Sequence, residues 1–182
     1  MSLLVASIVV GYLVGSVSPA TVIARRRGVD LATVGSGNPG ASNAGRALGR
    51  KTGIAVAVFD VVKGALPAAA FGAADHRAGL LAGVAAVIGH VTSPFLRGRG
   101  GKGVATALGA IVGSHPLWAP VALVAWLVVL GVSRWIALAS VLAALSVLIV
   151  AVVVSEDVLW AGVLALIVVV RHQGNFVRRL RG

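Results

Sequence analysis

Long apolar runs separated by short charged breaks constrain this chain more than any other feature of its sequence. The apolar segments are residues 2–24, 52–74, 78–96, 102–114, 117–132, 135–154 and 157–171. A helix needs about 20 apolar residues to cross a bilayer, and backbone groups in lipid must find their hydrogen bonds within the protein. The sequence therefore predicts an all-α integral membrane protein with about seven short transmembrane helices in a single domain, 1–182. Gly11-x-x-x-Gly15 and Gly79-x-x-x-Gly83 predict close helix packing.

The basic residues are unevenly distributed over these breaks. The net charge is +11, and fourteen of the sixteen Lys and Arg lie in alternate breaks, whereas Arg77 lies in an opposite break and Lys63 lies inside a span. Cytoplasmic loops are enriched in Lys and Arg, so we expect the N-terminus outside and the C-terminus in the cytoplasm. The membrane spans account for this charge, and no nucleic-acid partner is expected. The chain has no Cys, which excludes disulfides and Cys-bound metals.

The first motif with chemical content is the segment 35–46, which reads GSGNPGASNAGR. It contains G-x-G-x-x-G, but a dinucleotide site requires a preceding strand, and an apolar helix is expected there instead. Successive glycine amides can surround a phosphate, and a guanidinium can bind phosphate oxygens through two hydrogen bonds. The candidate ligands are Ser36, Gly37, Asn38, Gly40, Asn43 and Arg46. A flexible turn is the alternative interpretation.

The second motif is the segment 98–106, which reads GRGGKGVAT. It is not a Walker A loop, because neither Ser nor Thr follows Lys102. It places a cation and bare amides at the start of the short segment 102–114, where a helix N-terminus favours anions. That segment spans only about 20 Å at ~1.5 Å per residue, which predicts an active-site cleft on the cytoplasmic side. The candidates are Gly100, Gly101, Lys102, Gly103 and Thr106, and a basic membrane anchor is the alternative.

Several polar residues lie within or beside the spans. Asp60 and Lys63 are spaced i, i+3 inside the second span, which predicts a structural ion pair. His90 is interpreted equally well as a buried core histidine or as a functional one. The basic tail, residues 171–179, would place polar residues on one helix face, or would contact anionic lipid headgroups. No metal-ligand spacing and no pair of cytoplasmic acids occurs, so we expect no metal and no cofactor.

Together these motifs resemble the bacterial membrane acyl-phosphate:glycerol-3-phosphate acyltransferases of the PlsY type. The resemblance extends over residues 15–178 and departs from the family at Ser42, at Ala137 and in the segment 91–93, which is more polar than usual. Ser42 replaces the usual Thr. Ala137 replaces a common Ser, so the phosphate-contacting hydroxyl of this segment is assigned to Ser140 instead. The matching stretches are GSVSP at 15–19, GSGNPGASNAGR at 35–46, DVVKG at 60–64, Gly89-His90 with Pro94, GGKGVAT at 100–106, residues 134–140 and His172-x-x-Asn175-x-x-Arg178.

The resemblance implies transfer of a fatty acyl group from acyl phosphate to the 1-hydroxyl of glycerol 3-phosphate, giving 1-acylglycerol 3-phosphate. It implies a multi-pass protein of the bacterial inner membrane, surrounded by lipid, with the soluble enzyme that makes acyl phosphate as a partner. The implied catalytic residues are Lys102, Arg46, His172 and His90. Further substrate-binding residues are Arg134, Ser140, Asn175 and Arg178. The general base stays open between His172, His90 and the substrate phosphate.

Two other functional classes use the same sequence features. A membrane carrier or channel for a phosphate-bearing anion would use the same basic loops, but it needs a polar path across the membrane, and the outer loops are short and poor in cations. A scaffold for lipid-synthesis enzymes would tolerate changes at Lys102. Labelled glycerol 3-phosphate offered to the purified protein separates these classes.

Overall fold

The computed structural model describes residues 2–181, and these form nine α-helices and one short 3-10 helix. The chain divides into two compact units, Met1–Ser114 and His115–Gly182. The first unit contains α1 (Leu3–Ser16), α2 (Pro19–Arg26), α3 (Ala41–Leu48), α4 (Arg50–Gly72), α5 (His76–Thr92), η1 (Pro94–Leu96) and α6 (Val104–Ser114). The second unit contains α7 (Ala119–Ser133), α8 (Ile136–Val154) and α9 (Val158–Leu180).

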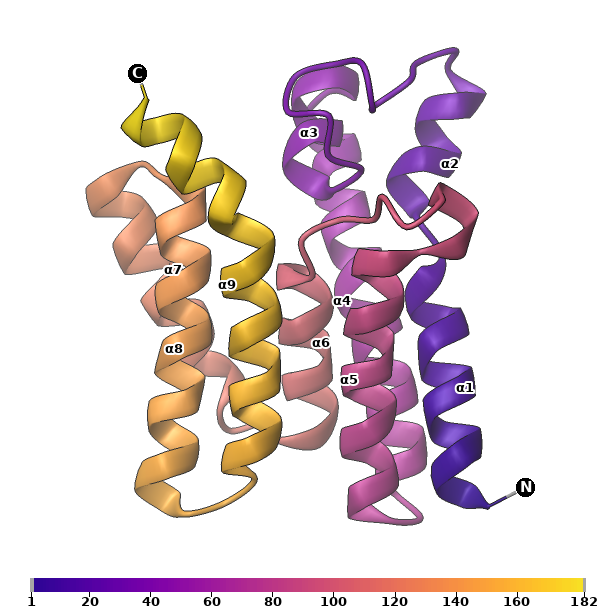
Figure 1. The fold of residues 1–182 in the computed structure, drawn as a ribbon, viewed down its shortest axis with the longest axis vertical. Helices are drawn as coiled ribbons and strands as arrows, with labels where there is room; N and C mark the ends of the chain where they lie inside the picture. The colour runs from indigo at the N-terminus through magenta and orange to yellow at the C-terminus, as the bar shows by residue number, and fades with distance from the viewer. Residues whose placement is uncertain (1, 182) are drawn as a thin grey trace. The chain divides into compact units, whose positions relative to one another are not determined.

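Glycines allow α1 and α5 to pack backbone against backbone. A Cβ atom at Gly11 would overlap the backbone of Ala82, and one at Gly15 would overlap the backbone of Ala86. The close packing predicted from this glycine spacing is therefore confirmed, and the two helices lie side by side in Figure 1. A similar contact joins α4 and α6, where a Cβ atom at Gly64 would overlap the carbonyl group of Thr106.

The first apolar segment is interrupted between α1 and α2. Pro19 is the first residue of α2, where its missing N–H costs nothing, and Ser18 caps the new helix. The interruption leaves two carbonyl oxygens without helical donors. The Ser93 hydroxyl donates to the Ser16 oxygen over 2.7 Å, and the Lys63 ammonium donates to the Val17 oxygen over 2.7 Å. One residue of α4 and one residue after α5 thus supply the hydrogen bonds that the carbonyl groups at the break between α1 and α2 lack.

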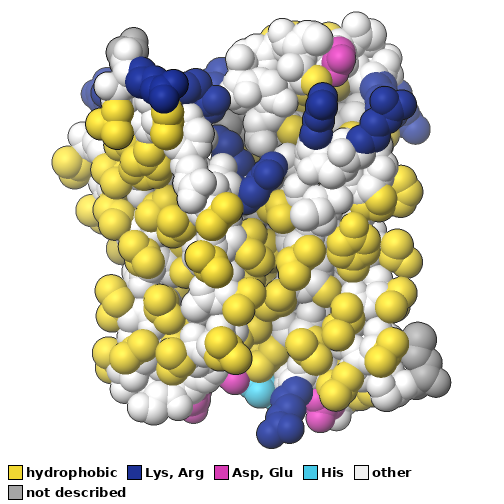
Figure 2. Space-filling view, in the orientation of Figure 1, with side chains coloured by type: hydrophobic (Ala, Val, Ile, Leu, Met, Phe, Trp, Pro, Cys, Tyr) yellow, Lys and Arg dark blue, Asp and Glu magenta, His cyan; other side chains and the backbone are white. Residues whose placement is uncertain are grey.

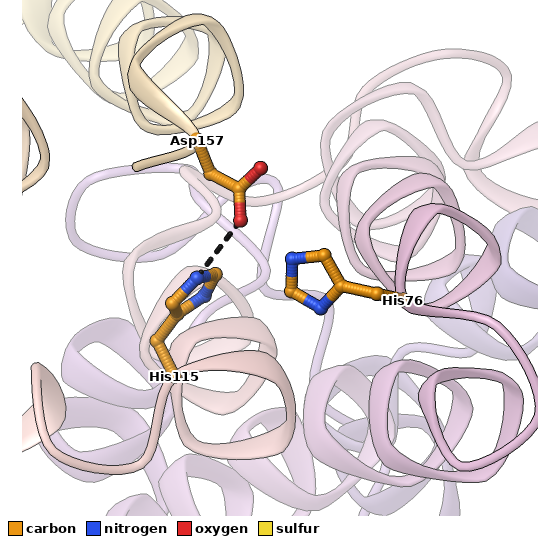
Figure 3. A group of neighbouring side chains, drawn as sticks. All are labelled: His76, His115 and Asp157. Carbon is orange, nitrogen blue, oxygen red and sulfur yellow. Dashed lines mark ion pairs between the residues drawn. The ribbon is translucent and has the colours of Figure 1, made fainter. Parts of the chain in front are cut away.

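In the second unit, α7, α8 and α9 are joined by short connections (Figure 1). At the end where α9 begins, His115 Nε2 lies 3.0 Å from Asp157 Oδ2, as Figure 3 shows. The His115 ring stacks on Trp118 with 4.0 Å between the ring centroids, and it also contacts Trp160. This ion pair ties the residues before α7 to the residues before α9.

The surface of each unit is that of a membrane protein. Hydrophobic side chains cover the flanks of the helices in Figure 2, and on α4 Phe59 and Leu66 are exposed. Five apolar segments are long enough to cross a membrane, namely Leu3–Arg26, Arg50–Gly72, His76–Leu96, Ile136–Val154 and Val158–Leu180. The apolar helices α6 and α7 are shorter. The chain is thus an all-helical, multi-pass integral membrane protein.

Three segments differ from the sequence-based expectation. The run 2–24 is split into α1 and α2 before Pro19, which has no N–H to donate to the preceding turn and favours the first position of a new helix. Helix α3 forms inside the predicted loop 25–51, where Leu31, Ala20 and Val56 bury Ala44. Helix α9 continues to Leu180, whereas the apolar segment ends at residue 171. The additional turns are polar and carry Arg178 and Arg179.

Candidate functional site

The two glycine-rich motifs lie at the same end of the first unit (Figure 1). One connects α2 to α3, and the other connects α5 to α6. Antiparallel packing places these connections together, because α4 and α6 run down the unit and α1 and α5 run up it. Six cations in or beside these two connections are exposed, namely Arg25, Arg26, Arg27, Arg46, Arg97 and Arg99. The predicted phosphate-binding segments therefore share one basic surface of this unit.

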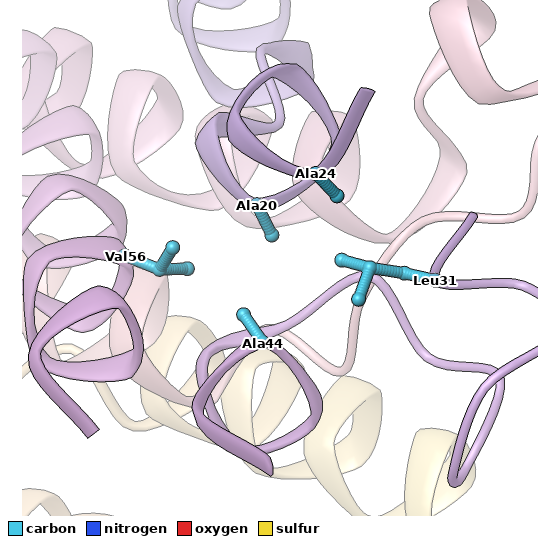
Figure 4. Close-up of a cluster of buried hydrophobic side chains, with 5 residues drawn as sticks. All are labelled: Ala20, Ala24, Leu31, Ala44 and Val56. Carbon is cyan, nitrogen blue, oxygen red and sulfur yellow. The ribbon is translucent and has the colours of Figure 1, made fainter. Parts of the chain in front are cut away.

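A small hydrophobic cluster supports the first glycine-rich loop. Figure 4 shows Leu31 of the loop pointing toward Ala44 of α3, between α2 and α4. The Arg27 guanidinium donates to the Leu48 oxygen and to the Thr52 hydroxyl, each over 3.2 Å, which ties the end of α2 to the start of α4. The loop is thus anchored on three helices although its own sequence is flexible.

Asn43 holds the first loop from inside. Its side-chain nitrogen donates to the oxygens of Leu31 and Val34, and its side-chain oxygen accepts the N–H of Ser36 over 3.0 Å. It is 1% exposed. Gly35 has φ of +59°, and a Cβ atom there would overlap the Asn43 oxygen. The carboxamide is engaged within the chain, which gives Asn43 a part in shaping the loop.

The remaining predicted residues of this loop lie nearer to solvent. Ser36 and Gly37 are exposed, Asn38 is half-buried, and Gly40 is buried at the start of α3. Arg46 is exposed in the last turn of α3. The exposed residues and the guanidinium therefore remain accessible to an anion.

The second loop folds back onto the end of α5. Gly100 N–H donates to the Val91 oxygen over 3.2 Å, and Gly101 N–H donates to the His90 oxygen over 3.0 Å. A Cβ atom at Gly101 would overlap Nε2 of the His90 ring. The loop is therefore seated directly on His90, and only glycine fits at this position.

Lys102 directly follows Gly101 and is half-buried just before the start of α6. Gly103, with φ of +82°, turns the chain into the helix. Thr106 is fully buried beneath Gly64, and among the described residues no hydrogen-bond partner of its hydroxyl is found. The Lys102 ammonium thus lies at a helix N-terminus, which favours a bound anion, whereas the Gly100 and Gly101 N–H groups are bonded to α5.

A buried polar cluster lies below this second loop. Lys63 Nζ lies 2.7 Å from Asp60 Oδ1, so the partners predicted from their spacing are in contact. It also lies 2.8 Å from His90 Nδ1. Asp60, Lys63 and His90 are all at most 7% exposed. Sequence reasoning did not connect His90 to this pair.

The second unit carries the other predicted residues. His172 is 2% exposed, and its Nδ1 lies 2.7 Å from the Val168 oxygen. On the same helix, Asn175 is half-buried and Arg178 is exposed. A carbonyl oxygen only accepts hydrogen bonds, so Nδ1 carries the proton, and a neutral His172 has its lone pair on Nε2.

Arg134 and Ser140 lie around the α7–α8 connection. Arg134 is exposed and adopts the left-handed conformation that ends α7, with φ of +52°. The Ser140 hydroxyl donates to the Ile136 oxygen over 2.8 Å and accepts the indole N–H of Trp126 over 3.3 Å. The sequence interpretation missed Trp126, and no motif marks it.

An aromatic cluster, also missed, lies beside these residues. The rings of Trp135 and Phe176 have centroids 4.7 Å apart, and the Arg179 guanidinium lies 5.9 Å from the Trp135 ring. This cluster connects the start of α8 to the last turns of α9. The position of Trp135 directly after Arg134, at the start of an apolar run, was the available signal, since Trp is enriched at membrane interfaces.

Comparison with known proteins gives consistent results over the whole length. A family model described as glycerol-3-phosphate acyltransferase matches residues 5–182. The glycerol-3-phosphate acyltransferase of Geobacter sulfurreducens is 42% identical over 178 residues, covering 94% of this chain and 91% of that protein. The protein of the same name from Aquifex aeolicus is 38% identical over 182 residues, covering 96% and 94%.

Two solved structures also match. One is PlsY (YgiH), an integral membrane glycerol 3-phosphate acyltransferase, in its glycerol 3-phosphate form. It is 35% identical with a TM-score of 0.94, covering 98% of this chain and 92% of that one. The other is the same enzyme in its lysophosphatidic acid form, with 34% identity, a TM-score of 0.91 and the same coverage.

Proposed function

Because this chain belongs to the glycerol-3-phosphate acyltransferase family, we propose that it transfers a fatty acyl group from acyl phosphate to the 1-hydroxyl of glycerol 3-phosphate. The product is 1-acylglycerol 3-phosphate, and inorganic phosphate is released. The match to an enzyme solved in its glycerol 3-phosphate form, over 98% of this chain, carries the proposal. The two basic, glycine-rich loops of the first unit support it, because both substrates bear a phosphate.

The chemistry requires charge stabilisation more than a covalent intermediate. The acceptor hydroxyl attacks the acyl carbonyl, the new ester C–O bond forms, and the bond from that carbon to the phosphate oxygen breaks. Phosphate is a good leaving group, so no protein nucleophile is needed. We assign phosphate binding to Arg46 and Lys102, since preorganised cations stabilise the developing negative charge. Arg134, Asn175 and Arg178 are proposed as further polar contacts.

The hydroxyl proton must pass to a base during this attack. His172 is our first candidate, because its Nδ1 donates to the Val168 oxygen, so that in a neutral ring Nε2 is the basic nitrogen. The substrate phosphate is the second candidate, because the second pKa of a phosphate monoester is about 6. Replacement of His172 distinguishes the two.

The proposed topology has seven spans with the N-terminus outside and the C-terminus in the cytoplasm. Five segments have spanning length, and α6 and α7 supply the other two. The basic connections support this orientation and a place in the bacterial inner membrane. The single-domain organisation stays a prediction, supported by the family match over residues 5–182. The soluble enzyme that makes acyl phosphate is proposed as a partner, because this mixed anhydride is prone to hydrolysis.

The topology is testable because the chain has no Cys. Single cysteines are introduced by Ser36→Cys, Arg99→Cys and Glu156→Cys and are labelled with a membrane-impermeant maleimide in inverted and right-side-out vesicles. Ser36→Cys and Arg99→Cys should react from the cytoplasmic side, and Glu156→Cys from the other side. If the first two react from opposite sides, no common phosphate-binding surface exists.

The activity test uses purified protein and labelled glycerol 3-phosphate, with either acyl phosphate or acyl-CoA as donor. We expect the label to move into an organic-extractable monoacyl product with acyl phosphate and not with acyl-CoA. Uptake of label into sealed vesicles without acylation would instead identify a carrier. Absence of both would contradict the enzyme and carrier assignments alike.

A further inference from the structure

Lys63 is the centre of the buried cluster formed with Asp60 and His90. Its ammonium nitrogen lies 2.7 Å from Asp60 Oδ1, 2.7 Å from the Val17 oxygen and 2.8 Å from His90 Nδ1. An ammonium group has three N–H donors and no acceptor. Two of these donors bond to the Val17 oxygen and to His90 Nδ1, and Asp60 is the ion-pair partner. Because the ammonium cannot accept, His90 Nδ1 must.

The need for an acceptor fixes the protonation of the His90 ring. A neutral imidazole has one donor and one acceptor nitrogen, so an Nδ1 that accepts from Lys63 leaves the proton on Nε2. We propose that Lys63 holds His90 in the Nε2–H tautomer, with this N–H at the Gly100–Gly103 loop, so that His90 positions the loop and is not the general base.

The alternative protonation states fit the geometry less well. A proton on Nδ1 would point at the ammonium N–H groups. Asp60 Oδ1 lies 3.6 Å from Nδ1, which is too long for a hydrogen bond that would compensate. A doubly protonated ring would add a second cation to a buried group that contains one carboxylate. With a neutral ring the cluster of Asp60, Lys63 and His90 has no net charge, which burial favours.

The other side of the ring faces the second loop. The His90 oxygen accepts the Gly101 N–H, and the Val91 oxygen accepts the Gly100 N–H. Nε2 lies so close to Gly101 that a Cβ atom there would overlap it. Backbone and ring of His90 thus define where Gly101 lies, and Lys102 is the next residue. His90 acts through the loop, as a positioning residue.

Nitrogen NMR tests the tautomer without any measurement of activity. The protein is labelled with ¹⁵N-histidine in detergent micelles near neutral pH, and its four histidines are assigned by loss of one signal in each single His→Gln variant. For His90 we expect a protonated Nε2 and an unprotonated Nδ1. A protonated Nδ1, alone or together with Nε2, would overturn the proposal. If His90→Gln does not fold, the other three variants assign His90 by elimination.

Enzyme kinetics test whether His90 positions the loop or acts as the general base, and this test rests on the proposed function. In His90→Gln the side chain keeps an N–H donor but has no basic nitrogen. We expect acyl transfer to persist, with the KM of one substrate raised about five- to tenfold because the amide fills the place of the ring less well and the loop shifts. The acidic limb of the pH–kcat profile should be retained. A general base must be unprotonated, so loss of that limb with a kcat reduction of about 100-fold or more would identify His90 as the base and overturn the proposal.

Two matched variants make these outcomes specific. Lys102→Ala shows which substrate the second loop binds, and the KM change of His90→Gln should fall on that same substrate. If Lys102→Ala has no effect, the assignment of the loop fails, while the NMR result on the tautomer still stands. Ser93→Ala removes a buried hydrogen bond at the same helix break without touching His90. It should leave the His90 nitrogen signals unchanged, and a changed tautomer there would contradict control by Lys63.

Discussion

His90 in the first unit and His172 in the second are both buried, but their Nδ1 atoms contact partners of opposite kind. They are 7% and 2% exposed, and each lies in a long helix beside a predicted substrate-binding segment. The Nδ1 of His90 contacts the Lys63 ammonium, whereas the Nδ1 of His172 contacts the Val168 oxygen. The first partner can only donate and the second can only accept, so the two rings carry their protons on different nitrogens. The partner of Nδ1, more than burial, decides which ring can accept a proton from a substrate.

The largest effect is expected when Lys63 is replaced by Met. This change leaves the Asp60 carboxylate buried without its cation, which costs about 3–5 kcal/mol of stability. Thermal unfolding in detergent measures the loss. The double variant Asp60→Asn/Lys63→Met removes both charges and should recover most of it. A single variant as stable as the double one would show that the charges of this cluster are not coupled.

Replacement of His172 by Gln should have the next largest effect. Loss of a general base lowers kcat by about 100-fold or more, and the acidic limb of the pH–kcat profile should vanish with it. Initial rates at saturating substrate measure both. An unchanged kcat would transfer the role of base to the substrate phosphate, and the contrast between the two histidines would then have no catalytic meaning.

Lys102→Ala tests the loop that rests on His90. Removal of a preorganised cation should lower kcat/KM by about tenfold or more, while the protein remains inserted and folded. Lys51→Ala is the matched control, because Lys51 is an exposed lysine outside both motifs. It should change the rate by less than about twofold, consistent with the small contribution of exposed charges. Equal losses in the two variants would point to general surface charge.

The smallest effect is expected at a third buried histidine, His115. Its partner Asp157 is partly exposed, so Asp157→Asn should reduce stability by at most about 1 kcal/mol. Acyl transfer should not change, because the ion pair lies at the opposite end of α9 from the basic tail. Parallel measurement of unfolding and turnover checks this. A loss of turnover at unchanged stability would show that this end of the unit takes part in catalysis.

The sequence predicted features that depend on local spacing and missed those that depend on long-range contacts. The i, i+3 spacing placed Asp60 beside Lys63, and the Gly11-x-x-x-Gly15 spacing predicted close helix packing without naming α5 as the partner of α1. The other two partners of Lys63, the Val17 oxygen and His90, are 46 and 27 residues away in the sequence, and no local pattern connects them to Lys63. The hydrogen bonds of Asn43 were missed for the same reason.

Helix α3 was missed for a different reason. Its sequence, ASNAGRAL, is short and contains Gly and Asn, which have low helix propensity. Packing of Ala44 against Leu31, Ala20 and Val56 stabilises it, and that packing exists only after α2 and α4 have come together. Tertiary contacts thus decide a helix that local propensity does not favour.

The glycine contacts between α1 and α5 and between α4 and α6 also bear on how this sequence can change over time. Lipid-facing positions such as Phe59 and Leu66 accept other apolar residues with little loss. At Gly15 and Gly64, by contrast, even one added methyl group would force two main chains apart. Such a separation would give lipid a path to Asp60 and Lys63. Divergence should therefore be rapid on the outside of these helices and nearly forbidden along the lines where they touch.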